Sequence, residues 1–334
     1  MRILVIGPGA LGIVTAVRLY KAGFDVEVAV RDQEKADRLN ERGLVMTDPD
    51  GQDHLARVPC VHDPKASGPY DLIIHTTKLQ VAADAMRAWL PTLAENGWVV
   101  PFQNGVAGDA LRAIVGGTRF MECSVYWPAT LVEEGYSMHT GGGQNVIGPW
   151  PDGPVTRHHE RIAEVLGHIA PTTTSPRMRG VKWSKLAINA AMTSCGVVTG
   201  KTLGEMIKHK ASRQAFLGVL RETVAVMDAA GISVMRVGPS KPDLLAKLPD
   251  WAARIALGAA ARRYGSSRSS SQQSMLRGEK TEVDFLNGLV VKVGAAHDVP
   301  TPVNQAVIGT VHAIEDGRLE PGLEAVEGMM GPLG

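Results

Sequence analysis

The sequence predicts an α/β protein in which an N-terminal Rossmann-like dinucleotide-binding domain precedes an all-α C-terminal domain. Three observations predict this fold class. Strand-like and helix-like segments alternate from Met1 to about Pro149, which is typical of a mainly parallel sheet. A glycine-rich turn joins the first strand to the first helix. Beyond Pro176 the strand patterns almost vanish, and the remaining segments have the periodicity of helices.

The first predicted strand leads into the glycine-rich turn. Ile3–Ile6 is a short apolar run with β-branched residues, as expected of a buried parallel strand. Gly7, Gly9 and Gly12 follow it as G-x-G-x-x-G, in front of a helix predicted over Ala10–Lys21. In this signature the first glycine permits a tight turn, the second admits a pyrophosphate, and the third brings the helix close to the strand. The phosphates of a dinucleotide would lie on free N–H groups at the helix N-terminus.

The end of the second predicted strand, which begins near Val26, distinguishes NADP from NAD. NAD-binding sites usually carry an acid there, which holds the ribose 2′-hydroxyl. Arg31 occupies this place, and a guanidinium can grip a 2′-phosphate with two hydrogen bonds. Lys35, one helical turn further on, could assist. Asp32 could instead reach the ribose, or Arg31 could be a solvated loop residue, but we favour NADP (NADPH) as the cofactor.

Two further strands end in polar residues. Tyr70–His75 is predicted to be a buried strand, and Thr76–Lys78 follow it. Gly97–Phe102 is the next strand, and it leads into Asn104–Gly105 through Gln103. Ligands of open α/β sheets bind beyond the carboxyl ends of the strands, so these polar residues are candidates for a binding site. An Asn-Gly pair is also a good turn, and both roles stay open for Asn104.

The other elements of the N-terminal domain are less sharply marked. Helices are predicted over Gln33–Arg42, Leu79–Leu93 and Thr156–Ile169, and strands near Leu44–Met46 and Ala56–Cys60. Several short strands between Arg119 and Ile147 are expected to extend the sheet or cap its edge. Pro171–Pro176 has the composition of a linker. We therefore place the NADP-binding domain at residues 1–172 and a helical substrate and dimerisation domain at residues 173–334.

A nearly all-apolar helix is predicted over Met178–Val198, which indicates a buried central helix. Lys185, Asn189 and Thr193 lie four residues apart in it and would line one face. Burying an ammonium group is strongly unfavourable unless it is paired or functional. Lysines in such positions can serve as acids or bases, although this lysine could also extend its charged end to water.

Further helices complete the C-terminal domain. They are predicted over about Ser212–Ala230, Trp251–Arg263, Thr281–His297 and Asn304–Glu315, with Pro239–Pro249 separating two of them. Val290–Val293 are candidates for exposed apolar residues, and on that basis a homodimer is a possible assembly.

Composition excludes several classes of protein. The formal net charge of +1 gives no overall basic excess, so no nucleic acid partner is expected. The three cysteines are odd in number and widely spaced, which favours a reducing compartment, and no metal-ligand spacing occurs. The chain starts with a core strand, and its apolar runs are short, so we expect neither a signal peptide nor a membrane span. A cytoplasmic protein is the expectation.

Taken together, these motifs resemble the ketopantoate reductase (2-dehydropantoate 2-reductase) family almost from end to end. The resemblance depends on Gly7–Gly12, Arg31, Thr77–Lys78, Gln103–Gly105, His139–Gly143, Trp183–Asn189, Lys280–Gly288 and Val299–Asn304. It implies NADPH-dependent reduction of a 2-oxo acid to a 2-hydroxy acid. By the resemblance Lys185 is the general acid that protonates the carbonyl oxygen, and Glu282 lies beside it, the substrate and the nicotinamide. The chemistry is sound, because a positioned ammonium stabilises and protonates an oxygen that receives negative charge.

The resemblance also assigns binding residues. Substrate contacts are expected from Asn104, Asn189, Thr193 and Ser270. Cofactor contacts are expected from Gly7, Gly9, Ala10, Leu11, Gly12, Arg31, Thr77, Lys78, Asn104 and Glu282. No metal is expected.

Two positions depart from the family pattern and bear on the substrate. Thr193 stands where relatives often have asparagine, and Ser274 where they tend to have aspartate. The threonine side chain is shorter, and we expect its hydroxyl to turn back to the carbonyl of Asn189, four residues earlier. Three hypotheses follow. The chain reduces ketopantoate, it reduces another 2-oxo acid such as a branched-chain one, or it is a non-catalytic NADP-binding sensor. Lys185 and Glu282 together argue against the sensor.

Overall fold

The structure, a computed structural model, describes residues 1–238, 241–264 and 269–333, of which 260–264, 270 and 333 by their backbone alone. These residues form two compact units, each described here by itself. Unit 1 spans Met1–Met178 and unit 2 spans Arg179–Gly334. No helix among the described residues combines the length and the hydrophobicity that crossing a bilayer requires.

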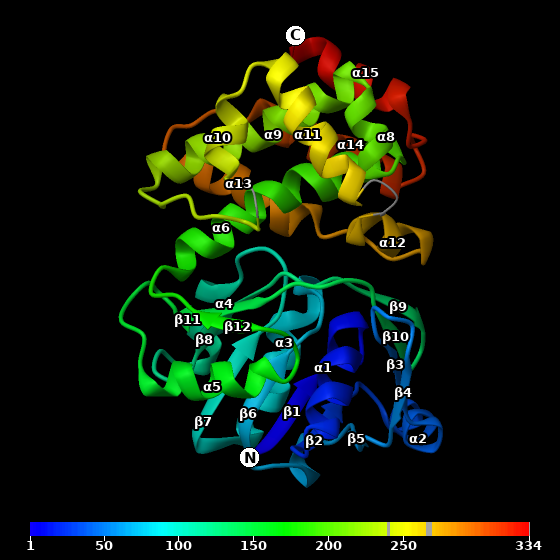
Figure 1. Ribbon diagram of the computed structural model, residues 1–334, viewed down its shortest axis with the longest axis vertical. Helices are drawn as coiled ribbons and strands as arrows, with labels where there is room; N and C mark the ends of the chain where they lie inside the picture. The colour runs from blue at the N-terminus through cyan, green and yellow to red at the C-terminus, as the bar shows by residue number, and fades with distance from the viewer. Residues whose placement is uncertain (239–240, 265–268, 334) are drawn as a thin grey trace. The chain divides into compact units, whose positions relative to one another are not determined.

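A five-stranded parallel sheet forms the centre of unit 1, in the order β5-β2-β1-β6-β7 (Figure 1). Its strands are β1 (Arg2–Ile6), β2 (Asp25–Ala29), β5 (Cys60–Val61), β6 (Tyr70–His75) and β7 (Leu93–Pro101). The connecting helices are α1 (Ala10–Lys21), α2 (Gln33–Arg42), η1 (Pro64–Ala66), α3 (Leu79–Trp89), η2 (Leu90–Thr92) and α4 (Gly108–Val115). The chain proceeds from β1 to one side of the sheet and then returns to the other side. The topological switch point therefore lies between β1 and β6, and the predicted fold class is confirmed.

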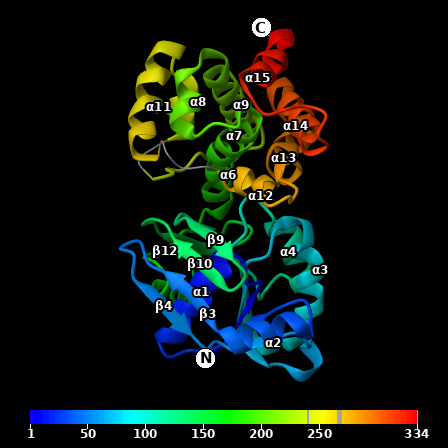
Figure 2. The same cartoon turned by 90° about the vertical axis from the view of Figure 1, so that its right-hand side faces the viewer.

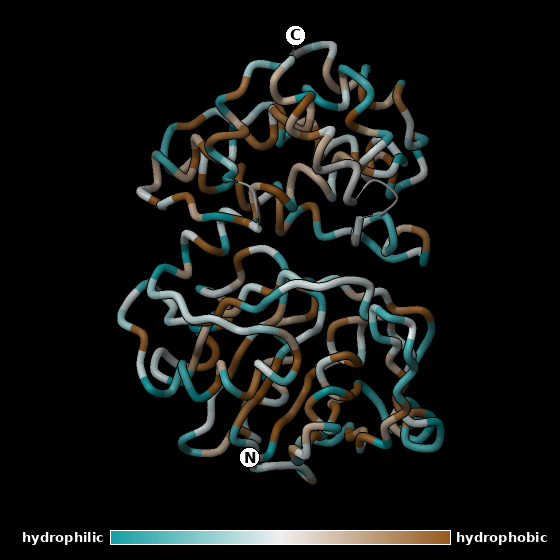
Figure 3. The backbone as a smooth tube through the Cα atoms, viewed as in Figure 1, coloured by the Kyte–Doolittle hydropathy of each residue, from teal (hydrophilic) through white to brown (hydrophobic). Residues whose placement is uncertain are grey.

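The strands of this sheet are buried as the sequence predicts. Ile3, Leu4 and Val5 of β1 and Ile73 and Ile74 of β6 are fully buried. Figure 3 shows the corresponding hydrophobic stretches in the interior of unit 1. Continuous apolar runs are needed here because helices cover both faces of a parallel sheet.

The short strands expected between Arg119 and Ile147 belong to two smaller sheets, and an isolated parallel bridge between Phe120 and Val99 connects this segment to β7, the edge strand of the parallel sheet. Of the two expectations, extending the sheet or capping its edge, the structure supports the second. The first sheet has the order β4-β3-β10-β9 and the second β12-β11-β8. Their strands are β3 (Leu44–Thr47), β4 (Asp53–Ala56), β8 (Met121–Val125), β9 (Ala129–Glu133), β10 (Tyr136–His139), β11 (Asn145–Pro149) and β12 (Thr172–Thr174). The four-stranded sheet packs on α1 (Figure 2), where the Ser137 hydroxyl donates to the carbonyl oxygen of Ala10 at 2.9 Å.

The segment interpreted as a linker is in part a strand. β12 follows α5 (Arg157–Gly167) and pairs in parallel with β11, with Asn145 opposite Thr172. Threonine is β-branched and suits a strand, and the polar composition fits because β12 lies at the edge of its sheet. Unit 1 consequently includes residues 173–178, which we had assigned to the second domain.

Unit 2 is built from helices. They are α6 (Met178–Asn189), η3 (Ala190–Ser194), α7 (Cys195–Thr199), α8 (Leu203–Lys208), α9 (Lys210–Ala229), α10 (Pro242–Lys247), α11 (Asp250–Tyr264), α12 (Ser270–Leu276), α13 (Val283–Ala296), α14 (Pro302–Glu315), α15 (Leu323–Met330) and η4 (Gly331–Leu333). The sequence patterns missed the short helices α8, α10, α12 and α15. Of the apolar residues expected at the surface, Val290 is fully buried in α13, whereas Val291 and Val293 are partly exposed.

Candidate functional site

The carboxyl ends of the parallel strands bring the predicted polar residues of unit 1 to one edge. β1 and β6 are neighbours, with Ile6 opposite His75, and β6 pairs with β7 in the same direction. Gly7 and Thr76 therefore follow adjacent strands at the switch point, where open α/β sheets bind their ligands.

Glycine is needed at each of the three positions of the turn for a different structural reason. Gly7 has a φ of +99°, which glycine tolerates without strain. A Cβ added to Gly12 would lie 2.0 Å from the carbonyl oxygen of Gly7, so a side chain there would separate α1 from the turn. A Cβ added to Gly9 would meet no atom within 4 Å. The space beside Gly9 is thus open, and Ala10 and Leu11 follow it in the first turn of α1, whose N–H groups have no acceptor within the helix.

This arrangement fits a dinucleotide. A pyrophosphate requires open space at the middle glycine, and it requires N–H donors at a helix N-terminus that are not used within the helix. The first turn of α1 contains no acidic residue that would repel the phosphates.

Thr76 and Thr77 support the turn from β6. The Thr76 hydroxyl lies 2.9 Å from the carbonyl oxygen of Ile6 and 2.8 Å from that of Gly7, so it acts on the protein's own backbone. The methyl group of Thr77 faces Gly7, and its hydroxyl lies 2.9 Å from Nε2 of His75. His75 is fully buried, and burial lowers its pKa to about 4. Sequence reasoning missed this supporting histidine, whose signal was a polar residue at the end of an apolar strand.

Lys78 and Asn104 stand at the start of the segments after β6 and β7. Lys78 is the N-cap residue of α3, and Asn104 lies in the bend between β7 and α4; both are half-buried. Gly105 has a φ of +72°, so the glycine supplies the unusual backbone conformation of the turn.

Arg31 lies just beyond β2 with its side chain 84% exposed. Its Nε donates to Oδ2 of Asp32 at 2.9 Å, and Oδ1 of Asp32 accepts from the backbone N–H of Lys35 at 2.8 Å. The Lys35 N–H, followed by the Arg31 guanidinium, holds the pKa of Asp32 below its ordinary value. Asp32 is therefore the N-cap of α2, which gives this acid a structural role.

The helix that carries Lys185 in unit 2 is not α-helical throughout. Lys185 and Asn189 are half-buried one turn apart in α6, and the π-helical segment η3 follows directly. Thr193 lies within η3 and is 7% exposed, and its hydroxyl donates to the carbonyl oxygen of Asn189 at 2.7 Å. This return of the hydroxyl to the backbone, expected from the sequence, is confirmed. The helix expected over Met178–Val198 is confirmed as one continuous helical run, but its middle turn, Ala190–Ser194, is π-helical. Such π-helical turns occur frequently at functional sites.

A buried chain of hydrogen bonds connects η3 to three other helices. The Ser194 hydroxyl donates to Oδ1 of Asn287 at 2.5 Å, and Nδ2 of Asn287 donates to Oδ1 of Asn304 at 2.9 Å. Nδ2 of Asn304 donates to the Glu222 carboxylate at 2.7 Å. Ser194, Asn287 and Asn304 are 2%, 0% and 0% exposed, so each bond replaces a contact with water that the fold has removed. We call this chain the polar network of unit 2.

The Glu222 carboxylate also caps α14 from α9. It accepts the backbone N–H groups of Val303 at 2.7 Å and Asn304 at 2.9 Å, in the first turn of α14. An anion at a helix N-terminus is stabilising, and the network therefore ends on a firmly held charge.

Glu282 is the N-cap residue of α13, the helix that carries Asn287. The preceding residue, Thr281, is anchored by its backbone N–H, which donates to Glu315 at 2.7 Å. Glu282 itself is half-buried. The polar network and this anchor fix the backbone on both sides of Glu282.

The serine-rich segment lies beside η3. Ser269 is the N-cap of α12, and its hydroxyl also lies 3.3 Å from the carbonyl oxygen of Thr193. Ser270 begins α12, but its side chain lies outside the described residues. Ser274 is 6% exposed. Unit 2 thus brings α12 and α13 together with η3, the segment that continues the helix of Lys185.

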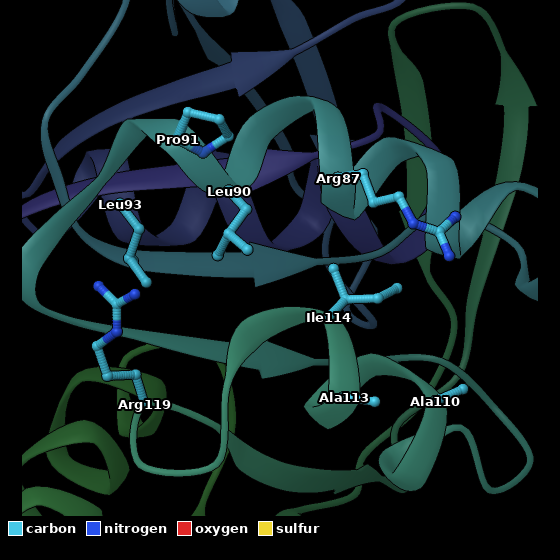
Figure 4. A pocket seen from close by; sticks show the side chains of 8 residues that line it. All are labelled: Arg87, Leu90, Pro91, Leu93, Ala110, Ala113, Ile114 and Arg119. Carbon is cyan, nitrogen blue, oxygen red and sulfur yellow. The ribbon is translucent and has the colours of Figure 1, made fainter.

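A separate groove of about 960 Å³ lies between α3 and α4 in unit 1 (Figure 4). Leu90, Pro91 and Ile114 contribute to its apolar wall, and Arg87 and Arg119 stand at its two ends. This groove includes none of the site residues predicted from the sequence. The strand ends of unit 1 and the Lys185 helix of unit 2 are therefore, each by itself, the better candidates for functional regions.

Comparisons with known proteins identify the family of the chain. A family model described as "Ketopantoate reductase PanE/ApbA" matches residues 3–152, and "Ketopantoate reductase PanE/ApbA C terminal" matches residues 177–315. A 2-dehydropantoate 2-reductase from Halobacterium salinarum is 27% identical over 325 residues, covering 95% of this chain and 100% of that protein.

Two solved structures extend the comparison. A PanE/ApbA family ketopantoate reductase from Ralstonia eutropha JMP134 has a TM-score of 0.81 and 27% identity, covering 95% of this chain and 99% of that one. D-mandelate dehydrogenase with NADH and anilino(oxo)acetate has a TM-score of 0.83 over 95% of this chain and 99% of that one, but only 19% identity. At that identity the likeness concerns the fold alone.

Proposed function

Because the chain belongs to the ketopantoate reductase family, a family of oxidoreductases, we propose that it reduces 2-dehydropantoate (ketopantoate) to pantoate with NADPH. The observation that carries the proposal is the half-buried Lys185, one helical turn from Asn189 and directly before a π-helical segment. A purely nucleotide-binding protein would have no use for an ammonium group in this position.

The proposed mechanism assigns a role to each side chain. The nicotinamide cofactor, when bound, supplies the hydride. Nζ of Lys185 donates a proton to the substrate's carbonyl oxygen and stabilises the negative charge that develops on it. The Glu282 carboxylate favours the charged form of the lysine and contacts the nicotinamide side of the site. Asn104, Asn189, Thr193 and Ser270 orient the substrate.

We propose NADPH, and not NADH, as the cofactor because of the position of Arg31. The D-mandelate dehydrogenase structure contains NADH, which supports a nicotinamide dinucleotide in general. Arg31 is exposed at the end of β2, and Asp32, the acid that could have held a ribose hydroxyl, caps α2. Gly7, Gly9, Ala10, Leu11 and Gly12 would hold the pyrophosphate, with Thr77 and Lys78 close by.

A second candidate substrate is a branched-chain 2-oxo acid. Thr193 favours it, because its hydroxyl already donates to the Asn189 carbonyl. A substrate hydroxyl then loses a partner that asparagine could provide, and ketopantoate carries such a hydroxyl whereas 2-oxoisovalerate does not. A homodimer and a cytoplasmic location remain predictions from the sequence.

The decisive experiment measures NADPH oxidation by the purified protein with a panel of 2-oxo acids. We expect the highest kcat/KM with ketopantoate and a clear preference for NADPH over NADH. Highest activity with 2-oxoisovalerate would favour the second candidate. Tight NADPH binding without turnover of any 2-oxo acid would contradict the proposal and favour a sensor.

A further inference from the structure

Four cations form a stripe that leads along α2 to the end of β2. Arg31, Lys35, Arg38 and Arg42 are spaced by four, three and four residues, which places them on one side of the helix. The Asp32 carboxylate connects Arg31 and Lys35, because it accepts hydrogen bonds from the Arg31 guanidinium and from the backbone N–H of Lys35. The Arg31 end of this basic stripe is where the proposed function expects the 2′-phosphate of NADPH.

The turn between β9 and β10 places two acids against the same stripe. Oε2 of Glu134 lies 3.4 Å from Nζ of Lys35, and Oε1 lies 2.9 Å from Nε of Arg38. Glu133 forms its ion pair with Arg42, at the opposite end of the stripe from Arg31. The hydrogen bond from Arg38 is the main reason why the pKa of Glu134 lies below its ordinary value, so this carboxyl is charged at neutral pH.

We propose that Glu134 sets the strength of NADP selectivity by holding the Lys35 ammonium group away from the 2′-phosphate. This inference rests on the proposed cofactor and adds to it a residue from a different sheet. Lys35 and Glu134 are 23% and 38% exposed, so the pair is accessible to water and can be exchanged for a phosphate. The carboxylate also repels the phosphate directly, and both effects weaken NADPH without affecting NADH, which has a hydroxyl at this place.

The test is the equilibrium affinity of the full chain for NADPH and for NADH, measured by titration calorimetry without substrate. Glu134→Gln keeps the shape of the side chain and removes its charge. We expect it to tighten NADPH binding by about three- to tenfold and to leave NADH within twofold. The matched control is Glu133→Gln. It removes the charge of the neighbouring acid, which pairs with Arg42 and not with Lys35, and it should change the affinity for neither cofactor.

A double-mutant cycle identifies the lysine. Lys35→Ala in the wild-type background should weaken NADPH binding only slightly, because Glu134 already engages the ammonium group. In the Glu134→Gln background the same substitution should weaken NADPH binding clearly more, because it removes the share of the gain that comes from the released ammonium group. Unchanged NADPH affinity in Glu134→Gln, or an equal gain for NADH, would overturn the inference.

A different result would refute the underlying proposal that the protein prefers NADPH. If the wild type binds NADH as tightly as NADPH and Arg31→Ala changes neither affinity, NADP selectivity itself is wrong. Selectivity that depends on Arg31 but not on Glu134 would leave the cofactor proposal standing and refute only the role of Glu134.

Discussion

The edge of the parallel sheet in unit 1 and the Lys185 region of unit 2 are held in place by different means. Around Gly7 and Gly12 the backbone itself sets the geometry, through a positive φ and a helix that passes within van der Waals distance of the turn. Around η3 the geometry depends on side chains, because the polar network joins residues as far apart as Ser194 and Asn304.

This difference determines how each region responds to substitution. In the glycine-rich turn of unit 1, an added side-chain atom cannot be accommodated where the turn and α1 touch. Substitutions there leave few polar groups without a hydrogen-bond partner. A buried polar network tolerates changes of shape better than the loss of a donor, since each unsatisfied group keeps its full desolvation cost.

Lys185→Ala should produce the largest change in the helical unit. We expect kcat to fall by about 100- to 10,000-fold, the range for loss of a general acid. NADPH affinity should stay nearly unchanged, because the cofactor contacts are assigned mainly to unit 1. Steady-state kinetics and a binding titration on the same preparation would check both. A variant within a few fold of the wild-type kcat would remove Lys185 from the mechanism.

His75 should make unit 1 sensitive to acid. Burial lowers its pKa from the ordinary 6.5 to about 4, so the unfolded chain takes up a proton at a higher pH than the folded protein does. Unfolding then binds a proton between these values, and stability falls as the pH decreases through this window. A pKa difference of one unit corresponds to about 1.4 kcal/mol of folding stability. Below pH 4 the full loss in the free energy of unfolding due to His75 is therefore about 3 kcal/mol.

His75→Gln provides the comparison, because glutamine can still bond to Thr77 but does not titrate. Urea unfolding at pH 7 and at pH 4.5 should show a smaller loss of stability in the variant. Equal losses in the two proteins would assign the acid sensitivity to other groups.

Gly12→Ala and Gly9→Ala should separate stability from binding in unit 1. At Gly12 the new methyl group would lie 2.0 Å from a backbone oxygen, so we expect a stability loss of about 3 kcal/mol together with weaker NADPH binding. At Gly9 the methyl group has open space within the protein, so stability should be kept while NADPH binding falls. Thermal unfolding and NADPH titration would test the pair, and normal NADPH affinity in Gly9→Ala would contradict the assignment of the pyrophosphate site.

Ser194→Ala tests the polar network of unit 2. The substitution leaves Oδ1 of Asn287 without this donor, and we expect a loss of about 1–3 kcal/mol in urea unfolding. Thr223→Val is the matched control, since the buried Thr223 hydroxyl donates only within its own helix, to Val219 at 2.7 Å. A control as destabilised as Ser194→Ala would mean that the network adds nothing beyond an ordinary buried hydroxyl.

Thr193→Asn should have the smallest effect, confined to substrate choice. We expect it to raise the preference for ketopantoate over 2-oxoisovalerate by about 1 kcal/mol or more, because asparagine can hydrogen-bond to the substrate hydroxyl. The measurement is kcat/KM for both acids, with Thr310→Asn as a control, where the hydroxyl bonds in the same way to Ala306 at 2.9 Å. A wild type that already prefers ketopantoate by more than about a thousandfold, roughly 4 kcal/mol, would show that Thr193 is no handicap.

The elements whose signals are local could be predicted from the amino-acid sequence. The bounds of α1 and α2 agree with those predicted, and the G-x-G-x-x-G turn lies between β1 and α1 as expected. Apolar periodicity, N-cap residues and glycines act within a few residues, so one sequence contains the whole signal. The return of the Thr193 hydroxyl to Asn189 was predictable for the same reason.

Only the tertiary structure decided the features that depend on distant partners. The threonines of β12 became a strand because β11 offered an unpaired edge, and Glu134 reached Lys35 because β10 pairs with β3. The Ser194–Asn287 bond likewise requires α13 in place. No periodicity along the chain contains these contacts, since their energy arises only when segments far apart in sequence are brought together.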